Sequence, residues 1–174
     1  MNIQPVLENI RLKLVPLTES DFEAVFIVAS DPKVWEQHPN KDRWKREVFR
    51  TFFDGALASK GSFKIIDKAT EEVLGCSRYY DFNEDENSIF VGYTFYGTSS
   101  WGKGVDPEVK KLMLDHIFQD VDVVKFHVGK DNRRSKIAME RLGAKPIKEI
   151  EVAYYGENPK INIEFWITKK DWQK

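Results

Sequence analysis

The chain has 174 residues, of which 41% are hydrophobic, enough for one domain with a hydrophobic core. Its 27 basic and 28 acidic residues leave a net charge of −1, so the composition argues against nucleic acid and membranes as partners. A single cysteine, Cys76, excludes a disulfide framework and a structural zinc cluster, and the three scattered histidines lack metal-binding spacing. Residues 1–10 are too polar for a signal peptide, and no apolar run approaches membrane-spanning length. We therefore expect one cytoplasmic domain over residues 1–174, without a metal.

The first third of the chain predicts a strand followed by two helices. Apolar and polar residues alternate over 10–17, which indicates a strand. Ser20 and Glu23 have the spacing of a capping box, so a helix should begin there and end near residue 30. Apolar and aromatic residues recur at helical spacing over 43–58, which predicts the second helix.

Three strands are predicted next, over 63–66, 73–82 and 88–96. Polar turns separate them, so they should form an antiparallel meander. A period of two in the third strand predicts one shared face for Ile89, Val91, Tyr93 and Phe95.

Helices and strands alternate in the second half of the chain. Helices are predicted over 107–119 and from about 131 to Gly143, and strands over 121–128, 146–155 and 160–167. The resulting order, β-α-α-β-β-β-α-β-α-β-β, indicates a single α+β domain whose central sheet is mixed, mostly antiparallel and flanked by helices. The last two strands are expected at an edge of the sheet, where pairing between subunits would give a homodimer.

A glycine-rich turn, Trp101-Gly102-Lys103-Gly104-Val105-Asp106-Pro107, directly precedes the helix predicted over 107–119. The first amides of a helix lack partners within the helix, and the helix dipole is positive at that end. Glycines let a phosphate approach the backbone without hindrance from a Cβ atom. The turn therefore predicts a ligand that carries phosphates.

Two phosphate ligands fit this turn poorly. Residues 97–104 have the GxxxxGK spacing of a nucleoside-triphosphate loop, but Gly104 stands where a hydroxyl should bind Mg²⁺. Gly102 and Gly104 begin a dinucleotide fingerprint, but Pro107 stands where its third glycine belongs.

Further motifs lie on both sides of the turn and span nearly the whole chain. They are Ile10-Arg11-Leu12-x-x-Val15-Pro16-Leu17, Asp31-Pro32-x-Val34-Trp35, Gly92-Tyr93, Asn132-x-Arg134-Ser135, Glu140-Arg141-Leu142-Gly143-Ala144 and Asp171-Trp172. In this order and spacing they resemble the GNAT N-acetyltransferase superfamily, and within it the branch of ribosomal-protein N-terminal acetyltransferases and their small-molecule-acylating relatives. In that superfamily a Q/R-x-x-G-x-G/A turn holds the pyrophosphate of acetyl-CoA. In this chain Trp101 stands at the first position of that motif, in place of Gln or Arg, as is common in this branch.

The resemblance implies a GNAT fold and an enzyme that moves an acetyl group from acetyl-CoA to a primary amine by direct attack. It also implies that the strand 88–96 splays from its neighbour, so that its backbone contacts pantetheine and donates an amide to the oxyanion. Arg134 would pair with the 3′-phosphate, and Asn132 with pantetheine. The implied acetyl-CoA-binding residues are Phe95, Tyr96, Trp101, Gly102, Lys103, Gly104, Val105, Asn132, Arg134 and Ser135.

Two residues are expected to carry the chemistry. Ser135 lies in the first turn of its helix and would donate a proton to the departing thiolate, because Met139 stands where many superfamily members have a tyrosine. A serine that only hydrogen-bonds backbone at a helix start is an equally good interpretation. Glu151 lies where the branch can place a carboxylate facing the acceptor, so it is the expected base. Asp81, His38 and water remain alternatives.

Asp106 stands where the superfamily prefers a small residue. It suits an N-cap with Pro107 as the first helical residue, and its carboxylate would then compete with pyrophosphate for the same amides. We therefore expect Asp106→Asn to tighten acetyl-CoA binding. The alternative function is a non-catalytic acyl-CoA-binding module of the same fold. The charge of the chain fits a small amine and a protein N-terminus equally well as the acceptor.

Overall fold

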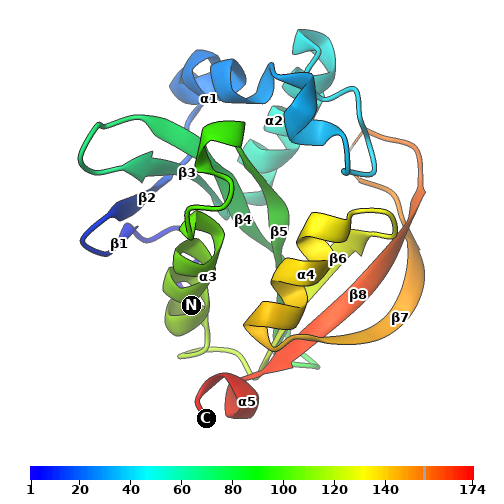
Figure 1. The fold of residues 1–174 in the computed structure, drawn as a ribbon. Coiled ribbons are helices and arrows are strands. Elements are labelled where there is room, and N and C mark those ends of the chain that lie inside the picture. Colours follow the sequence, from blue (N-terminus) through cyan, green and yellow to red (C-terminus); the bar gives the residue numbers. More distant parts are fainter. Residues whose placement is uncertain (155) are drawn as a thin grey trace.

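The computed structural model describes residues 1–154 and 156–174. Its centre is an eight-stranded sheet in the order β1-β2-β3-β4-β5-β6-β8-β7 (Figure 1). The strands are β1 (Leu7–Glu8), β2 (Leu12–Pro16), β3 (Ser62–Asp67), β4 (Val73–Asn83), β5 (Ser88–Tyr96), β6 (Val123–Gly129), β7 (Lys145–Val152) and β8 (Lys160–Thr168). The pairing of β5 with β6 is parallel, and the other described pairings are antiparallel. The predicted α+β fold with a mixed, mostly antiparallel sheet is confirmed.

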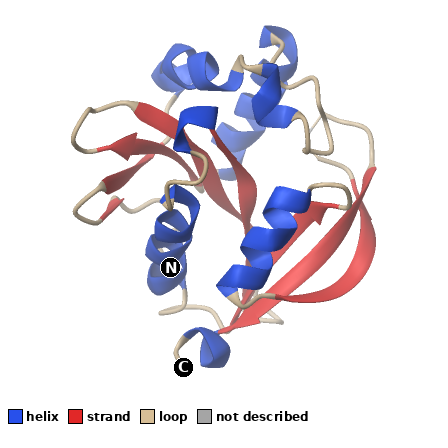
Figure 2. Cartoon of the chain, viewed as in Figure 1, coloured by secondary structure: helices blue, strands red, loops and turns tan. Residues whose placement is uncertain are grey.

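Helices cover both faces of this sheet (Figure 2). The longer helices are α1 (Phe22–Ala29), α2 (Arg46–Ser59), α3 (Val105–Ile117) and α4 (Arg133–Leu142). A short helix, α5 (Lys169–Trp172), lies at the end of the chain. Three short 3₁₀ turns, η1 (Glu19–Asp21), η2 (Pro32–Trp35) and η3 (Thr98–Ser100), lie in the connections. α3 and α4 pack on one face through aliphatic side chains, and α1 and α2 pack on the other through a cluster of aromatic rings. No described helix is long and apolar enough to cross a membrane.

The start of the first helix differs from its prediction. The carboxylate of Asp21, not that of Glu23, reaches back and accepts a hydrogen bond from the backbone N–H of Thr18 at 2.8 Å. The chain makes the turn η1 before α1 begins, which moves the start of the helical segment upstream of Ser20. Glu23 instead accepts two hydrogen bonds from Arg46 on α2. The capping box predicted at Ser20 and Glu23 is therefore wrong.

A β-bulge in β5 reverses the face that its side chains present. The register pairs Arg78 with Gly92 and Cys76 with Phe95, so β5 carries one residue more than β4 between these points. Tyr93 takes up the extra length with a φ of +52°. Ile89 and Val91 consequently pack with α3, whereas Phe95 packs among the rings of α2. The prediction that these residues share one face is wrong, because a bulge shifts a period of two by one residue.

β5 and β6 separate soon after they begin. Their parallel register covers residues 88–90 of β5 and 123–125 of β6. Beyond it, β5 follows β4 as far as Tyr96 and β6 follows β8 as far as Gly129. The sheet therefore opens in a V between the two strands, as the resemblance implied. Only β7 lies at this edge of the described sheet, because β8 is held between β6 and β7, so the expectation of two edge strands is wrong.

Candidate active site

A cavity of about 550 Å³ lies in the V between β5 and β6. Its walls come from β5, from the glycine turn, from β6, from the start of α4 and from the segment before α2. Nine of the ten residues expected to bind acetyl-CoA line it: Phe95, Tyr96, Trp101, Gly102, Gly104, Val105, Asn132, Arg134 and Ser135. The tenth, Lys103, is not among the lining residues, and its carbonyl accepts a hydrogen bond from Arg11 at 2.8 Å.

The glycine turn has a backbone that favours glycine at two positions. Gly102 has a φ of +74° and Gly104 a φ of +75°, in the left-handed region that side chains with a Cβ rarely adopt. A Cβ atom built on Gly102 meets no described atom within 4 Å. Protein packing therefore leaves the space beside Gly102 open, and Gly102 is one of the residues that line the cavity. The turn leads directly into the N-terminus of α3, an arrangement suited to an anion.

Asp106 does not cap this helix. α3 begins at Val105 with Gly104 as its N-cap, so Asp106 lies within the first turn. Its carboxylate accepts hydrogen bonds from the hydroxyl of Tyr96 at 2.6 Å and from Lys110 Nζ at 2.8 Å. Burial alone would raise the pKa of Asp106, but the charge of Lys110 and these hydrogen bonds hold it below its ordinary value. The prediction that Asp106 caps the helix is therefore wrong, because Gly104 is the N-cap and the carboxylate of Asp106 is paired with Tyr96 and Lys110. That Asp106→Asn tightens acetyl-CoA binding stays a prediction.

The start of α4 faces this turn across the cavity. Asn132 is the N-cap, and its Oδ1 accepts a hydrogen bond from the backbone N–H of Ser135 at 3.2 Å. The cap thus uses the backbone N–H of Ser135 and not its hydroxyl, and Ser135 lines the cavity. The guanidinium of Arg134 stacks on Trp101, with 3.7 Å between Cζ and the ring centre, and so connects α4 to the turn.

Comparison with known protein families decides the identity of this fold. Residues 11–145 match the family model described as acetyltransferase (GNAT) domain, which covers more than half of the chain. The chain belongs to the GNAT acetyltransferase family. It is an acyltransferase of the acetyl-CoA-dependent N-acetyltransferase class, as predicted.

Solved acetyltransferases share the fold over almost the whole chain. A GCN5-related N-acetyltransferase from Brucella melitensis is 18% identical with a TM-score of 0.84, and the match covers 98% of this chain and 81% of that one. RimJ from Mycobacterium smegmatis, in complex with CoA-disulfide, is 15% identical with a TM-score of 0.75 and coverage of 98% and 88%. Spermidine N-acetyltransferase from Vibrio cholerae, in complex with CoA and spermine, is 13% identical with a TM-score of 0.72 and coverage of 95% and 100%. No curated protein matches the sequence.

This GNAT domain also places polar groups in its cavity that sequence reasoning did not assign to the site. Arg43, just before α2, forms a buried ion pair with Glu157, and Tyr154 donates a hydrogen bond to Asn162 at 2.6 Å. Both Arg43 and Tyr154 line the cavity. No sequence signal marks them, because they come from loops more than 100 positions apart.

The expected base, Glu151, is not brought to the cavity. It lies exposed on the edge strand β7, opposite Ile161, and is absent from the residues that line the cavity. Asp81, an alternative base, does not line the cavity. It lines a second, open groove on the α2 side of the sheet. His38 does line the cavity, but burial, helped by the charges of Arg43 and Arg134, lowers its pKa to about 3. His38 is therefore a poor proton acceptor at neutral pH.

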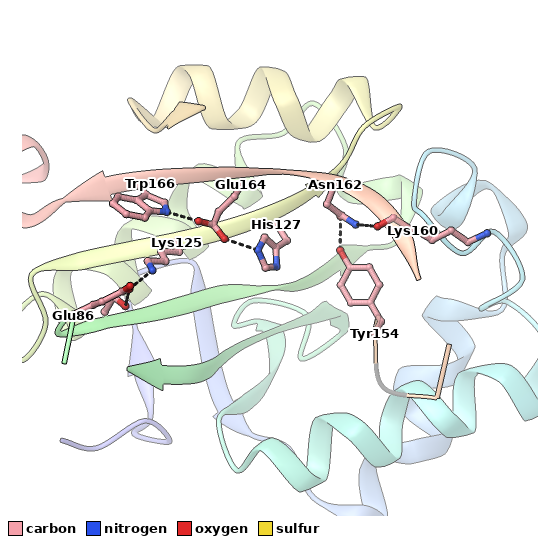
Figure 3. A network of polar contacts seen from close by, with 9 residues as sticks. Glu86, Lys125, His127, Tyr154, Lys160, Asn162, Glu164 and Trp166 are labelled. Atoms are coloured by element: carbon pink, nitrogen blue, oxygen red, sulfur yellow. Dashed lines mark hydrogen bonds and ion pairs between the residues drawn. The ribbon is translucent and has the colours of Figure 1, made fainter. Parts of the chain in front are cut away.

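A histidine that the sequence analysis passed over is shared by the cavity and the groove. His127 on β6 lines both. Its Nε2 lies 2.9 Å from Oε1 of Glu164, and Trp166 Nε1 donates to the other oxygen of that carboxylate at 2.7 Å. Figure 3 shows the three side chains on the side of β6 and β8 that faces away from α4. In the described part of the chain, no three side chains of His, Cys, Asp or Glu gather into a possible metal site.

Proposed function

We propose that this protein transfers the acetyl group of acetyl-CoA to a primary amine by direct attack of the amine on the thioester. The observation that carries the proposal is the cavity in the V, which is lined by two glycines with left-handed backbone, Gly102 and Gly104, just before α3. Its volume lies within the range typical of sites for small molecules and cofactors. The motifs at residues 10–17, 31–35 and 132–144 support membership in the ribosomal-protein N-terminal acetyltransferase-like branch.

The backbone of the turn would hold the pyrophosphate. The amides around Gly102 and Gly104 lie next to the N-terminus of α3, where negative charge is favoured. Beyond Phe90 the inner edge of β5 has no partner strand among the described residues, so the backbone near Phe95 and Tyr96 would pair with pantetheine. An amide of the same edge would stabilise the oxyanion, a contribution typically worth about 3 kcal/mol. Asn132 and Arg134 would complete the site from α4.

Ser135 is the proposed proton donor to the departing thiolate. Its hydroxyl lies in the first turn of α4, and the side chain borders the cavity. Met139, one turn further along α4, also borders the cavity and has no proton to donate. On α4, the role of the acid therefore falls to Ser135.

A pair of glycine variants tests whether the turn binds the donor. Gly102 and Gly143 both have a positive φ, +74° and +90°, and an added Cβ meets no described atom within 4 Å at either position. Replacement by alanine should therefore cost about 1–2 kcal/mol of stability at each. Only Gly102 lines the cavity. Isothermal titration with CoA should show about tenfold weaker binding for Gly102→Ala, equivalent to about 1.4 kcal/mol, and unchanged binding for Gly143→Ala. Equal affinities for the two variants would remove the turn from the donor site.

A further inference from the structure

We propose that His127, oriented by Glu164, is the base that deprotonates the acceptor, and that the acceptor is a primary ammonium compound entering through the groove on the α2 side of the sheet. This inference rests on the proposed acetyl transfer and deepens it. It replaces Glu151, which lies outside both the cavity and the groove.

His127 lies where β5 and β6 begin to separate. Phe90 and Lys125 are the last residues in the parallel register of β5 and β6, and His127 follows two residues later, where the V begins to open. Side chains of a strand alternate between faces, and Phe126 and Val128 pack in the core beside α3. His127 therefore faces the opposite side, and its ring lies 4.4 Å from that of Phe90. A group at this point can reach both a thioester in the cavity and an amine in the groove.

Glu164 is hydrogen-bonded to both His127 and Trp166, which fixes the imidazole of His127 in place. The side chains of His127 and Glu164 are only 11% and 5% exposed, so the pair is held in a fixed geometry (Figure 3). Burial raises the pKa of Glu164, but the hydrogen bonds from His127 and Trp166 outweigh this effect and hold the pKa below its ordinary value. The carboxylate is thus ionised at neutral pH, and it accepts a hydrogen bond from Nε2–H of His127. Nδ1 then keeps its lone pair, and the negative charge of Glu164 stabilises the imidazolium that forms when Nδ1 takes up a proton.

The proton balance follows from these positions. A primary amine is mostly protonated at neutral pH, so Nδ1 of His127 removes one proton from the ammonium and leaves a neutral amine. The amine nitrogen bonds to the thioester carbonyl carbon, and the C–S bond breaks as the tetrahedral intermediate collapses. The second proton of the nitrogen passes to the thiolate through the hydroxyl of Ser135. The products are an amide, free CoA thiol and one proton, which His127 returns to water.

Other charged groups surround His127 without competing for this role. Those that face the groove are Asp81, Glu84, Glu86, Lys125, Lys148 and Glu164. Those that line the cavity are Arg43, Asp106, Lys110, Arg134 and Arg141. Lys125 is paired with Glu86, and Lys110 with Asp106. Among these groups, only Glu164 contacts the imidazole of His127 in the described structure.

The test measures thiol release from acetyl-CoA with spermine and with a serine-initiated peptide, for variants of His127 and Glu164. At neutral pH, His127→Ala and the shape-conserving His127→Asn should lower kcat/KM by about 100-fold. The loss should shrink as the pH rises towards about 10, because the amine then arrives already deprotonated. Glu164→Gln should show a smaller loss with the same pH dependence. CoA binding, measured by titration, should remain within about twofold of the wild type for all variants, since none of them touches the glycine turn.

Two control histidines sharpen this test. His116→Ala removes a histidine on α3 that lies outside the cavity and the groove, and it should leave the rate unchanged. His38→Gln removes the other histidine that lines the cavity and should keep the pH profile of the wild type. Thiol release by the wild type that is insensitive to His127 variants, or a loss that is equal at all pH values, would overturn the assignment of the base alone. No thiol release by the wild type with either amine would overturn the proposed function itself.

Discussion

Replacing Arg43 with methionine should lower the free energy of unfolding by about 3–5 kcal/mol. Arg43 Nε and Nη2 each donate to the carboxylate of Glu157 at 2.7 Å. The two side chains are only 4% and 6% exposed, so the variant leaves the charge of Glu157 buried without its partner. The guanidinium also lies over the rings of Phe52 and Tyr154, at 5.0 and 5.3 Å from their centres. Urea denaturation monitored by circular dichroism measures the loss.

A second arginine pair provides the matched control. Arg46 donates two hydrogen bonds to Glu23 at 2.6 and 3.1 Å, so its geometry is similar, but these side chains are 56% and 69% exposed. Exposed pairs contribute little, because water screens them in both the folded and the unfolded chain. Arg46→Met should therefore shift the midpoint of urea denaturation far less than Arg43→Met. Equal shifts would contradict the account of Arg43, and the double variant Arg43→Met, Glu157→Leu should recover part of the loss because no buried charge remains.

Ser135→Ala should lower kcat by between about 100-fold and 10,000-fold, the range expected for loss of a general acid. The thiolate would then leave without a proton from the enzyme, whereas the backbone amides proposed to hold the pyrophosphate are unchanged. Stopped assays of thiol release give kcat, and titration with CoA gives the affinity, which should stay within about twofold of the wild type.

Ser135→Thr is the control for this variant, because it keeps the hydroxyl at the same helix position. It should retain much of the activity that Ser135→Ala loses. The helix cap is not at stake in either variant, since Asn132 Oδ1 accepts the capping hydrogen bond from the backbone. Full activity in Ser135→Ala would remove this residue from the mechanism.

Local patterns in the sequence predicted the order of the longer elements, but not the short β1 and α5, and they predicted most of the residues of the glycine turn and of the start of α4 that line the cavity. The glycine turn and the start of α4 are contiguous motifs, so their residues reach the cavity through local geometry alone. The single glycine turn also excluded a Mg²⁺-bound triphosphate, because Gly104 has no hydroxyl. The prediction that Asp106 caps α3 was wrong, because the N-cap is Gly104, a glycine with left-handed backbone two residues earlier.

The proposed acceptor end depends on strand register, which the sequence does not display. The bulge at Tyr93 turns Phe95 to the α2 side, and nothing in a period of two announces one extra residue. His127 meets Glu164 because β6 and β8 pair antiparallel with these two residues opposite each other. Glu151 lies on the next strand of the same sheet, but at its exposed edge. A carboxylate 37 positions from its histidine becomes visible only when the strands are paired.

This GNAT domain is proposed to acetylate a primary amine with acetyl-CoA bound in the V between β5 and β6. The most direct measurement follows free CoA thiol and acetylated amine together, by a thiol reagent and by mass spectrometry, with acetyl-CoA and spermine or a serine-initiated peptide. Thiol and acetylated amine should appear in equal amounts, and only when the amine is present. Tight binding of acetyl-CoA without amine-dependent thiol release would contradict this proposal and would instead indicate a non-catalytic acyl-CoA-binding module.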